Sequence, residues 1–351
     1  MNRATFKKWG PFILLLAFFS FWLVWKKPAH QEVHSTTHLA MGTLVTVSTW
    51  GVATSVEEKA VVQIFARIDQ VEELASRQKT GTPVYQVNHA TPGTPVVVPE
   101  ELATILAAGL EMHTLTNGAF DPGLGFLSDL WGFGHGLPDV GKIPAATELT
   151  AWLHERKKNT DYGIKLVQEP SGAMTVQVDG YPFTLDLGAI AKGYALDKAM
   201  ETMKQSGVQN GLIIGGGDMI ITGSKGGQPW RIGIQHPRDH DKIMASSEIK
   251  GDLAMATSGD YERFFMVDGE REHHILDPQT AKPSRSGLIS VSIQTQKAMT
   301  ADMLSTAVFV MGMEKGRKFI EKMVGVEGML VTENGERWKS PGFQGQWLEG
   351  P

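Results

Sequence analysis

Two side chains in the segment TADMLSTAVFVMG, residues 300–312, could together hold a metal ion. Asp302 and Thr306 are four residues apart, so they share one face of a helix if this segment is helical. A carboxylate and a hydroxyl suit a hard cation such as magnesium, which prefers oxygen ligands. A structural explanation is equally good for this segment alone, because Thr300 would cap the helix and Asp302 would favour its positive end.

A second group of charges lies in residues 185–200, LDLGAIAKGYALDKAM, where the hydrophobic period changes. Before this segment, apolar residues alternate around Asp179-Gly180, which predicts a β-hairpin whose second strand enters it. In its second half the apolar residues recur at helical spacing, which predicts a helix. N–H groups at the start of a helix lack partners and favour anions, so Asp186 and Lys192 flank a candidate site for a charged ligand.

His274 is a candidate general base in the segment HHILDPQTAKP, residues 273–283. Histidine titrates near neutral pH, so a base of ordinary pKa would lose rate as the pH falls through about 6–7. The structural alternative is a histidine that ends a strand, with Asp277-Pro278 starting a turn.

The composition excludes several other kinds of site. The 351 residues carry a net charge of -5 and no basic stripe, which argues against nucleic acid as a partner. The chain has no cysteine, so it forms no disulfide, thiolate metal site or cysteine nucleophile. Gly215-Gly216-Gly217 does not start a dinucleotide-binding motif, because Ile220 stands where that motif needs glycine.

Residues 1–27 have the character of a membrane anchor. An almost purely apolar run from Pro11 to Trp25 has basic residues on both sides, and no small-residue cleavage site follows it. A buried core helix is a poor explanation because every face of the run is apolar. An uncleaved anchor is favoured over a cleaved signal peptide, although cleavage stays open, and both favour export of the rest of the chain.

The remaining chain is expected to comprise a polar linker (28–38), one catalytic domain (39–340) and an irregular tail (341–351). Helices are predicted at 55–76, 100–116 and 301–323, a loop at 80–99, and strands at 41–51, 210–223, 230–237, 288–296 and 328–338. The glycine-rich stretch 117–141 cannot be regular structure throughout. Hairpins interleaved with helices indicate an α+β fold with mixed, largely antiparallel sheets and packed helices.

Stretches in this order resemble the ApbE family, the FAD:protein FMN transferases. They are MGT (41–43), AFDP with LWGFG (119–134), DLGAIAKGYALD (186–197), GGGD (215–218), SGDYER (258–263), HHILDP (273–278) and ADMLSTA (301–307). The resemblance spans residues 38–325. In one departure, Ala281 stands where the family commonly has glycine, which puts the shape of that loop in question.

The resemblance implies cleavage of the FAD pyrophosphate, release of AMP and transfer of FMN to a threonine or serine hydroxyl of an acceptor flavoprotein. It implies that Asp302, Thr306 and the carbonyl of Ala189 bind Mg²⁺, and that His274 deprotonates the acceptor. The FAD site implied by the family is lined by Met41, Ala119, Phe120, Asp121, Asp186, Lys192 and Ile275.

Two other functions are compatible with the motifs. One is a hydrolase that cuts FAD to FMN and AMP, and the other is a flavin-binding protein without turnover. A storage protein needs neither a metal site nor a base, so the intact Asp302, Thr306 and His274 argue against the latter. The family suggests exported or membrane-bound redox subunits as acceptors, such as those of sodium-pumping NADH:quinone oxidoreductases. It thus implies a catalytic domain on the periplasmic side of the bacterial inner membrane.

Overall fold

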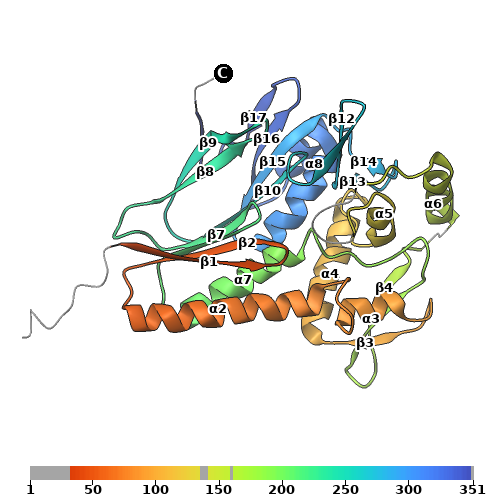
Figure 1. Ribbon diagram of the computed structural model, residues 1–351, viewed down its shortest axis with the longest axis horizontal. Helices are drawn as coiled ribbons and strands as arrows, with labels where there is room; N and C mark the ends of the chain where they lie inside the picture. The colour runs from red at the N-terminus through yellow and green to blue at the C-terminus, as the bar shows by residue number, and fades with distance from the viewer. Residues whose placement is uncertain (1–31, 135–140, 159–160, 349–351) are drawn as a thin grey trace, which may run out of the picture.

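The computed structural model describes residues 32–134, 141–158 and 161–348 (Figure 1). The expected anchor at 1–27 lies outside these described residues. Within them, no helix has the length and apolar character needed to cross a membrane.

The centre of the fold is an eight-stranded sheet in which every neighbouring pair is antiparallel. In spatial order its strands are β1 (Val33–Ala40), β2 (Thr43–Trp50), β6 (Gly211–Gly215), β7 (Asp218–Thr222), β10 (Leu253–Gly259), β15 (Leu288–Thr295), β16 (Glu327–Thr332) and β17 (Arg337–Lys339).

Three helices cover one face of this sheet, namely α2 (Thr54–Ala75), α7 (Ala191–Gln205) and α8 (Ala298–Ile320) (Figure 1). Successive side chains of a strand point to opposite faces, so β6 places Ile213 in the core beneath these helices and Leu212 in a second core. The second core is closed by the small sheet of β8 (Trp230–His236), β9 (Asp239–Ile249) and β18 (Gln346–Trp347).

The other elements form a smaller part of the molecule beside the helices (Figure 1). They are α3 (Pro83–His89), β3 (Val96–Val98), α4 (Glu100–Leu115), α5 (Gly125–Leu130), α6 (Ala146–Lys158), β4 (Ile164–Gln168) and β5 (Met174–Val178). Two short hairpins follow β10, one of β11 (Phe264–Val267) and β12 (Glu270–His273), the other of β13 (Leu276–Asp277) and β14 (Lys282–Pro283).

The α+β prediction is confirmed, but the hairpin around Asp179-Gly180 is wrong. Strand β5 ends at Val178 and pairs with β3 and β4, while residues 183–187 form no strand. The backbone of Leu185 instead exchanges two hydrogen bonds with the side-chain amide of Asn88, at 2.8 and 2.9 Å. An alternating pattern therefore marks a buried segment here, without a partner strand.

Three segments predicted as irregular are partly ordered into elements. The 80–99 loop contains α3 and β3. The linker prediction is wrong from Val33 onward, because β1 pairs with β2 and hydroxyl groups pair across the two strands, as in Ser35 with Ser48 at 2.8 Å. The tail is held because Phe343 is buried in the second core and β18 pairs with β9.

Ala281 keeps the loop shape that a glycine would give. Its φ is 58°, in the left-handed region that glycine adopts without strain, and its carbonyl accepts a hydrogen bond from the Trp131 indole at 3.0 Å. Ala281 thus adopts a backbone conformation that is typical of glycine.

Candidate active site

The starts of α7 and α8 meet at Gly193. A Cβ atom on Gly193 would lie 2.3 Å from the carbonyl oxygen of Ala298, so only glycine permits this approach. Asp302, in the first turns of α8, is 3% exposed, and its Oδ2 accepts the Gly193 N–H at 3.0 Å. The crossing therefore fixes the Asp302 carboxylate against the first turn of α7.

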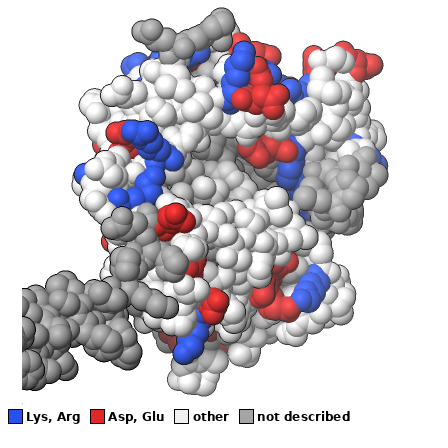
Figure 2. Space-filling view, turned by 60° about the vertical axis from the view of Figure 1, so that its left-hand side comes forward, with Lys and Arg blue, Asp and Glu red and all other residues white. Residues whose placement is uncertain are grey.

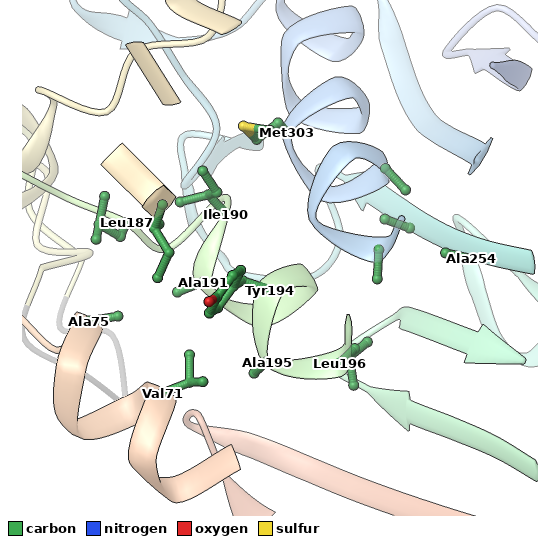
Figure 3. Packing of buried hydrophobic residues seen from close by; sticks show 14 of the residues in the cluster. Val71, Ala75, Leu187, Ile190, Ala191, Tyr194, Ala195, Leu196, Ala254 and Met303 are labelled. Carbon is green, nitrogen blue, oxygen red and sulfur yellow. The ribbon is translucent and has the colours of Figure 1, made fainter. Parts of the chain in front are cut away.

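Packing around the first turn of α7 holds the crossing in place. Figure 3 shows Leu187, Ile190 and Tyr194 around this turn, with Met303 of α8 and Val71 of α2 on either side. All five side chains are buried.

Asp197, and not Thr300, accepts hydrogen bonds from the unpaired backbone N–H groups at the start of α8. The Asp197 carboxylate accepts the backbone N–H groups of Ala298 and Met299 at 2.8 and 3.1 Å. Burial raises the pKa of Asp197, although these two bonds oppose the shift. The structural explanation given above for Thr300 is therefore wrong, since α8 begins two residues before it and Lys297 is its N-cap residue.

Lys192 lies between two buried carboxylates. Its Nζ is 3.1 Å from Oδ2 of Asp218, which follows the glycine turn after β6, and 3.3 Å from Oδ1 of Asp302. Burial alone would lower the pKa of Lys192, but these carboxylates raise it overall. Burial raises the pKa of Asp218 to about 7, with Lys192 opposing and the charge of Asp302 adding to the shift. One ammonium thus faces two acids, and the raised pKa leaves Asp218 partly protonated near neutral pH.

Hydroxyl groups extend the site along α8. Thr306 lies one turn beyond Asp302 on the same helix, as predicted, and its Oγ1 is 3.3 Å from Oγ of Ser258 at the end of β10. Ser258 also lies 2.8 Å from the hydroxyl of Ser305. These contacts between hydroxyl groups indicate that α8 and β10 form one wall of the site.

The residues present suit a hard cation. The N–H of Gly193 belongs to the first turn of α7, where N–H groups lack intrahelical partners, and it is directed to Asp302. Carboxylate, hydroxyl and carbonyl oxygens are the donors that Mg²⁺ prefers. In the part of the chain that the structure describes, no three His, Cys, Asp or Glu residues form a metal-binding group. The implied ligand set does not require such a group, since only Asp302 in it is acidic.

Arg77, which sequence reasoning missed, organises the neighbouring loop. Its side chain is 8% exposed, pairs with Asp129 of α5 at 2.6 Å, and lies 3.2 Å from Oδ2 of Asp186. Asp186 also accepts the N–H of Gly188 at 2.9 Å, which ties it to the turn before α7. A Cβ atom at position 134 would displace the Asp129 carboxylate and the Arg77 guanidinium, so Gly134 leaves room for this ion pair.

His274 directly follows β12, so it does end a strand, but it also has the geometry of a base. Its Nδ1 lies 3.2 Å from the carbonyl of Arg263, and a ring nitrogen facing a carbonyl must donate its proton. Nε2 is then the nitrogen that can accept a proton. The Arg263 side chain is in turn held by the carbonyl of Phe133 at 2.7 Å.

The expected loss of rate at pH 6–7 needs correction. Burial, followed by the charge of Arg263, lowers the pKa of His274 to about 3. The charge of Lys192 also contributes, which places Lys192 near the imidazole. The ring is therefore neutral, and able to accept a proton, throughout the physiological pH range.

The residues expected to line the FAD site are only partly brought together. Met41 lines a small pocket with Lys192, and its N–H is held by Glu72 at 2.6 Å. Phe120 and Ile275 are buried in the main core, so their side chains face away from solvent.

The loop that carries Ala119 and Asp121 reaches the turn before α7 through its backbone, since the Pro122 carbonyl accepts the N–H of Asp186 at 2.8 Å. The Asp121 carboxylate is fully enclosed by Arg156, the Tyr162 hydroxyl and the N–H of Gly123, which makes it a structural anchor for its loop. Ala119 lines a cavity of about 580 Å³.

Charged side chains of both signs surround a hollow on the face shown in Figure 2, and Lys and Arg are interspersed there with Asp and Glu.

Of the residues that sequence reasoning missed, Asp218 had a signal, since it ends the GGGD stretch. Arg77 and Ser258 had none beyond their residue type, because their partners come from distant segments.

Gly193→Ala is expected to lower the free energy of unfolding by about 1–3 kcal/mol, because the new methyl group clashes with the backbone of α8. Gly109→Ala on α4 is the matched control, since its Cβ would meet only ordinary contacts of 3.6 Å or more. Urea unfolding of both variants measures the difference. Equal stability of the two would contradict the tight crossing.

Buried His273 and half-buried His274 are expected to make the protein labile to acid. Burial lowers the pKa of His273 to about 4 and that of His274 to about 3. The unfolded chain, with ordinary values near 6.5, then binds more protons. This stability is complete above about pH 6.5 and is lost as the pH falls toward 4, by about 1.4 kcal/mol per pH unit for each histidine.

Denaturant unfolding between about pH 4 and pH 7 measures this dependence. His273→Gln should reduce the slope by one proton, whereas the same change at His154, whose side chain is 66% exposed, should leave it as in the wild type. The same slope in both variants would contradict the role of burial.

Comparisons with known proteins converge on one family. Residues 41–330 match the ApbE family. The chain is 32% identical over 309 residues to the FAD:protein FMN transferase of Klebsiella pneumoniae (strain 342), a match that covers 87% of this chain and 86% of that protein. The FAD:protein FMN transferase of Salmonella typhimurium is 31% identical over 322 residues, covering 90% and 89% of the two chains.

Solved structures agree with this assignment. The ApbE protein of Thermotoga maritima superimposes with a TM-score of 0.78 at 34% identity, covering 88% of this chain and 97% of that chain. The flavin transferase ApbE from Vibrio cholerae gives a TM-score of 0.74 at 28% identity, with coverage of 88% and 97%.

Proposed function

This chain belongs to the ApbE family and is an enzyme of the FAD:protein FMN transferase type, and we propose that it moves FMN from FAD to a threonine or serine hydroxyl of an acceptor flavoprotein. The observation that carries the proposal is the cluster of Lys192, Asp218, Asp302 and Thr306 at the start of α7. It combines a cation with oxygen donors, as a pyrophosphate substrate and its metal ion require.

The residues of the proposed site have different roles. Asp302, Thr306 and the Ala189 carbonyl would hold Mg²⁺, which when bound would stabilise negative charge on the phosphate oxygens. Lys192 contributes a second positive charge near the same oxygens. Asp186, held by Arg77, positions the part of FAD that lies over the turn before α7.

In the proposed reaction, the acceptor oxygen attacks the phosphorus on the FMN side of the pyrophosphate. A new P–O bond forms as the bond to the AMP phosphate breaks, and AMP leaves with the electron pair of that bond. His274 takes the hydroxyl proton on Nε2, while the Arg263 carbonyl keeps the proton on Nδ1. A neutral imidazole is ready for this step because burial suppresses its protonation.

The direct test mixes the purified protein, FAD, Mg²⁺ and a soluble fragment of the flavin-carrying subunit of a sodium-pumping NADH:quinone oxidoreductase. Mass spectrometry should find one FMN added to the fragment and one AMP released. FMN and AMP in solution, with an unmodified fragment, would identify a hydrolase. FAD bound without turnover would identify a flavin-binding protein.

We further propose that residues 1–27 anchor the protein in the bacterial inner membrane with the catalytic domain on the periplasmic side. The basis is the long apolar run with basic flanks and no cleavage site. Expressed with its own N-terminus, the protein is expected in the membrane fraction and accessible to protease from the periplasm. A soluble mature chain beginning after Lys27 would contradict the anchor.

A further inference from the structure

The turn between β1 and β2 contains a residue type that such a turn disfavours. Met41 and Gly42 both have positive φ, at 53° and 71°, and Ala40 pairs with Thr43 across the turn. This is the pattern of a type I′ turn, in which asparagine or aspartate usually precedes the glycine. Methionine has no side-chain oxygen that could bond the backbone locally in the left-handed region, so its presence there costs free energy.

The Met41 side chain lies in the candidate active site. It lines the small pocket together with Lys192 and with side chains from the first half of α7. A Cβ atom on Gly216 would lie 3.1 Å from the Thr43 side chain, so the residue after the turn lies against the glycine turn before Asp218. An unfavourable backbone conformation at such a place indicates that the function requires this side chain.

Glu72 of α2 holds the turn through the backbone. Its Oε2 accepts the N–H of Met41 at 2.6 Å, although the two residues are 31 positions apart. Helix α2 is itself fixed to the core here, because Ile68 and Val71 are at most 1% exposed. A charged acceptor makes a stronger hydrogen bond than a neutral one, so this carboxylate can hold a conformation that methionine disfavours.

We propose that Glu72 is a positioning residue of the FAD site, because its carboxylate keeps the Met41-Gly42 turn in the conformation that places the Met41 side chain beside Lys192. The inference rests on the proposed function, since it assigns the pocket beside Lys192 to FAD. Without the carboxylate the turn relaxes in the free protein. FAD binding must then restore the turn, which lowers the apparent affinity by the fraction of molecules in the competent conformation.

FAD binding by variants of Glu72 tests this role, measured by fluorescence titration without acceptor or Mg²⁺ so that no turnover occurs. Glu72→Ala should raise the FAD dissociation constant roughly tenfold, the usual scale of a lost hydrogen bond to a charged group. Glu72→Gln keeps an oxygen acceptor and should recover most of the affinity. Glu73→Ala is the matched control, because Glu73 is the next residue of α2, is 56% exposed and pairs with Lys79 at the surface. This control should bind FAD as the wild type does.

A second background distinguishes positioning of Met41 from a general effect on the fold. Met41→Asn supplies the residue that the turn favours and removes the side chain that Glu72 positions. Adding Glu72→Ala to it should therefore change the FAD dissociation constant by less than about twofold.

The proposal is overturned if Glu72→Ala weakens FAD binding equally in both backgrounds, or no more than Glu73→Ala does. A lower melting temperature of Glu72→Ala with unchanged FAD affinity would show a purely structural role and would also overturn it. A wild-type protein that binds no FAD would refute the proposed function as well, whereas unchanged affinity in Glu72→Ala refutes the positioning role alone.

Discussion

Asp302→Ala is expected to lower FMN transfer roughly a thousandfold while FAD binding changes much less. A metal ion on the reacting phosphate contributes several kcal/mol to stabilisation of the transition state, and each 1.4 kcal/mol is about a tenfold change in rate. Asp302 is the one carboxylate in the proposed ligand set, and it also anchors Lys192 at 3.3 Å. Transfer rates and FAD dissociation constants, both measured with and without Mg²⁺, check this expectation.

Asp302→Asn distinguishes the loss of a metal ligand from a loss of stability. Its side-chain oxygen can still accept the N–H of Gly193, so the α7–α8 crossing and the melting temperature should be kept. Its missing charge should still lower transfer severely. Full turnover of this variant, or of wild-type enzyme stripped of metal by a chelator, would refute the metal site.

His274→Ala is expected to slow transfer by roughly a hundred- to ten-thousand-fold, the usual cost of losing a general base. FAD and Mg²⁺ binding should persist, because phosphate charge is compensated by Lys192 and the metal. Wild-type transfer should keep its rate as the pH falls through about 6–7, since burial lowers the pKa of His274 to about 3. Transfer rate, melting temperature and the pH profile are measured on the same preparations.

A purely structural histidine gives a different result. The folded variant would then transfer FMN at a near-normal rate and melt earlier. Asp260 is a poor substitute as base, because both its oxygens are held by Arg238 at 2.7 Å. Asp277 would then be the next candidate.

The sequence predicted those features that depend on local periodicity or on motifs. The helical face shared by Asp302 and Thr306 follows from a spacing of four residues, and α2 and α7 follow from their apolar stripes. The family resemblance rests on short stretches whose order is enough to identify the fold.

Contacts between distant segments could not be predicted in this way. Nothing near Arg77 in the sequence indicates that it pairs with Asp129 and Asp186, since those residues lie 52 and 109 positions later. Burial of a side chain within the assembled fold was equally inaccessible. The pKa of His274 therefore differs from the ordinary value that the sequence analysis used.

Two adjacent peptide carbonyls connect the proposed base, His274, with the turn before α7. The carbonyl of Phe133 holds Arg263, whose own carbonyl orients His274, and the carbonyl of Gly134 lies 3.3 Å from the Arg77 guanidinium that pairs with Asp186. The base and the turn before α7 are thus mechanically coupled through a single dipeptide. A shift of this dipeptide would move both together, so the energetic effects of changes at Arg77 and Arg263 should not add independently.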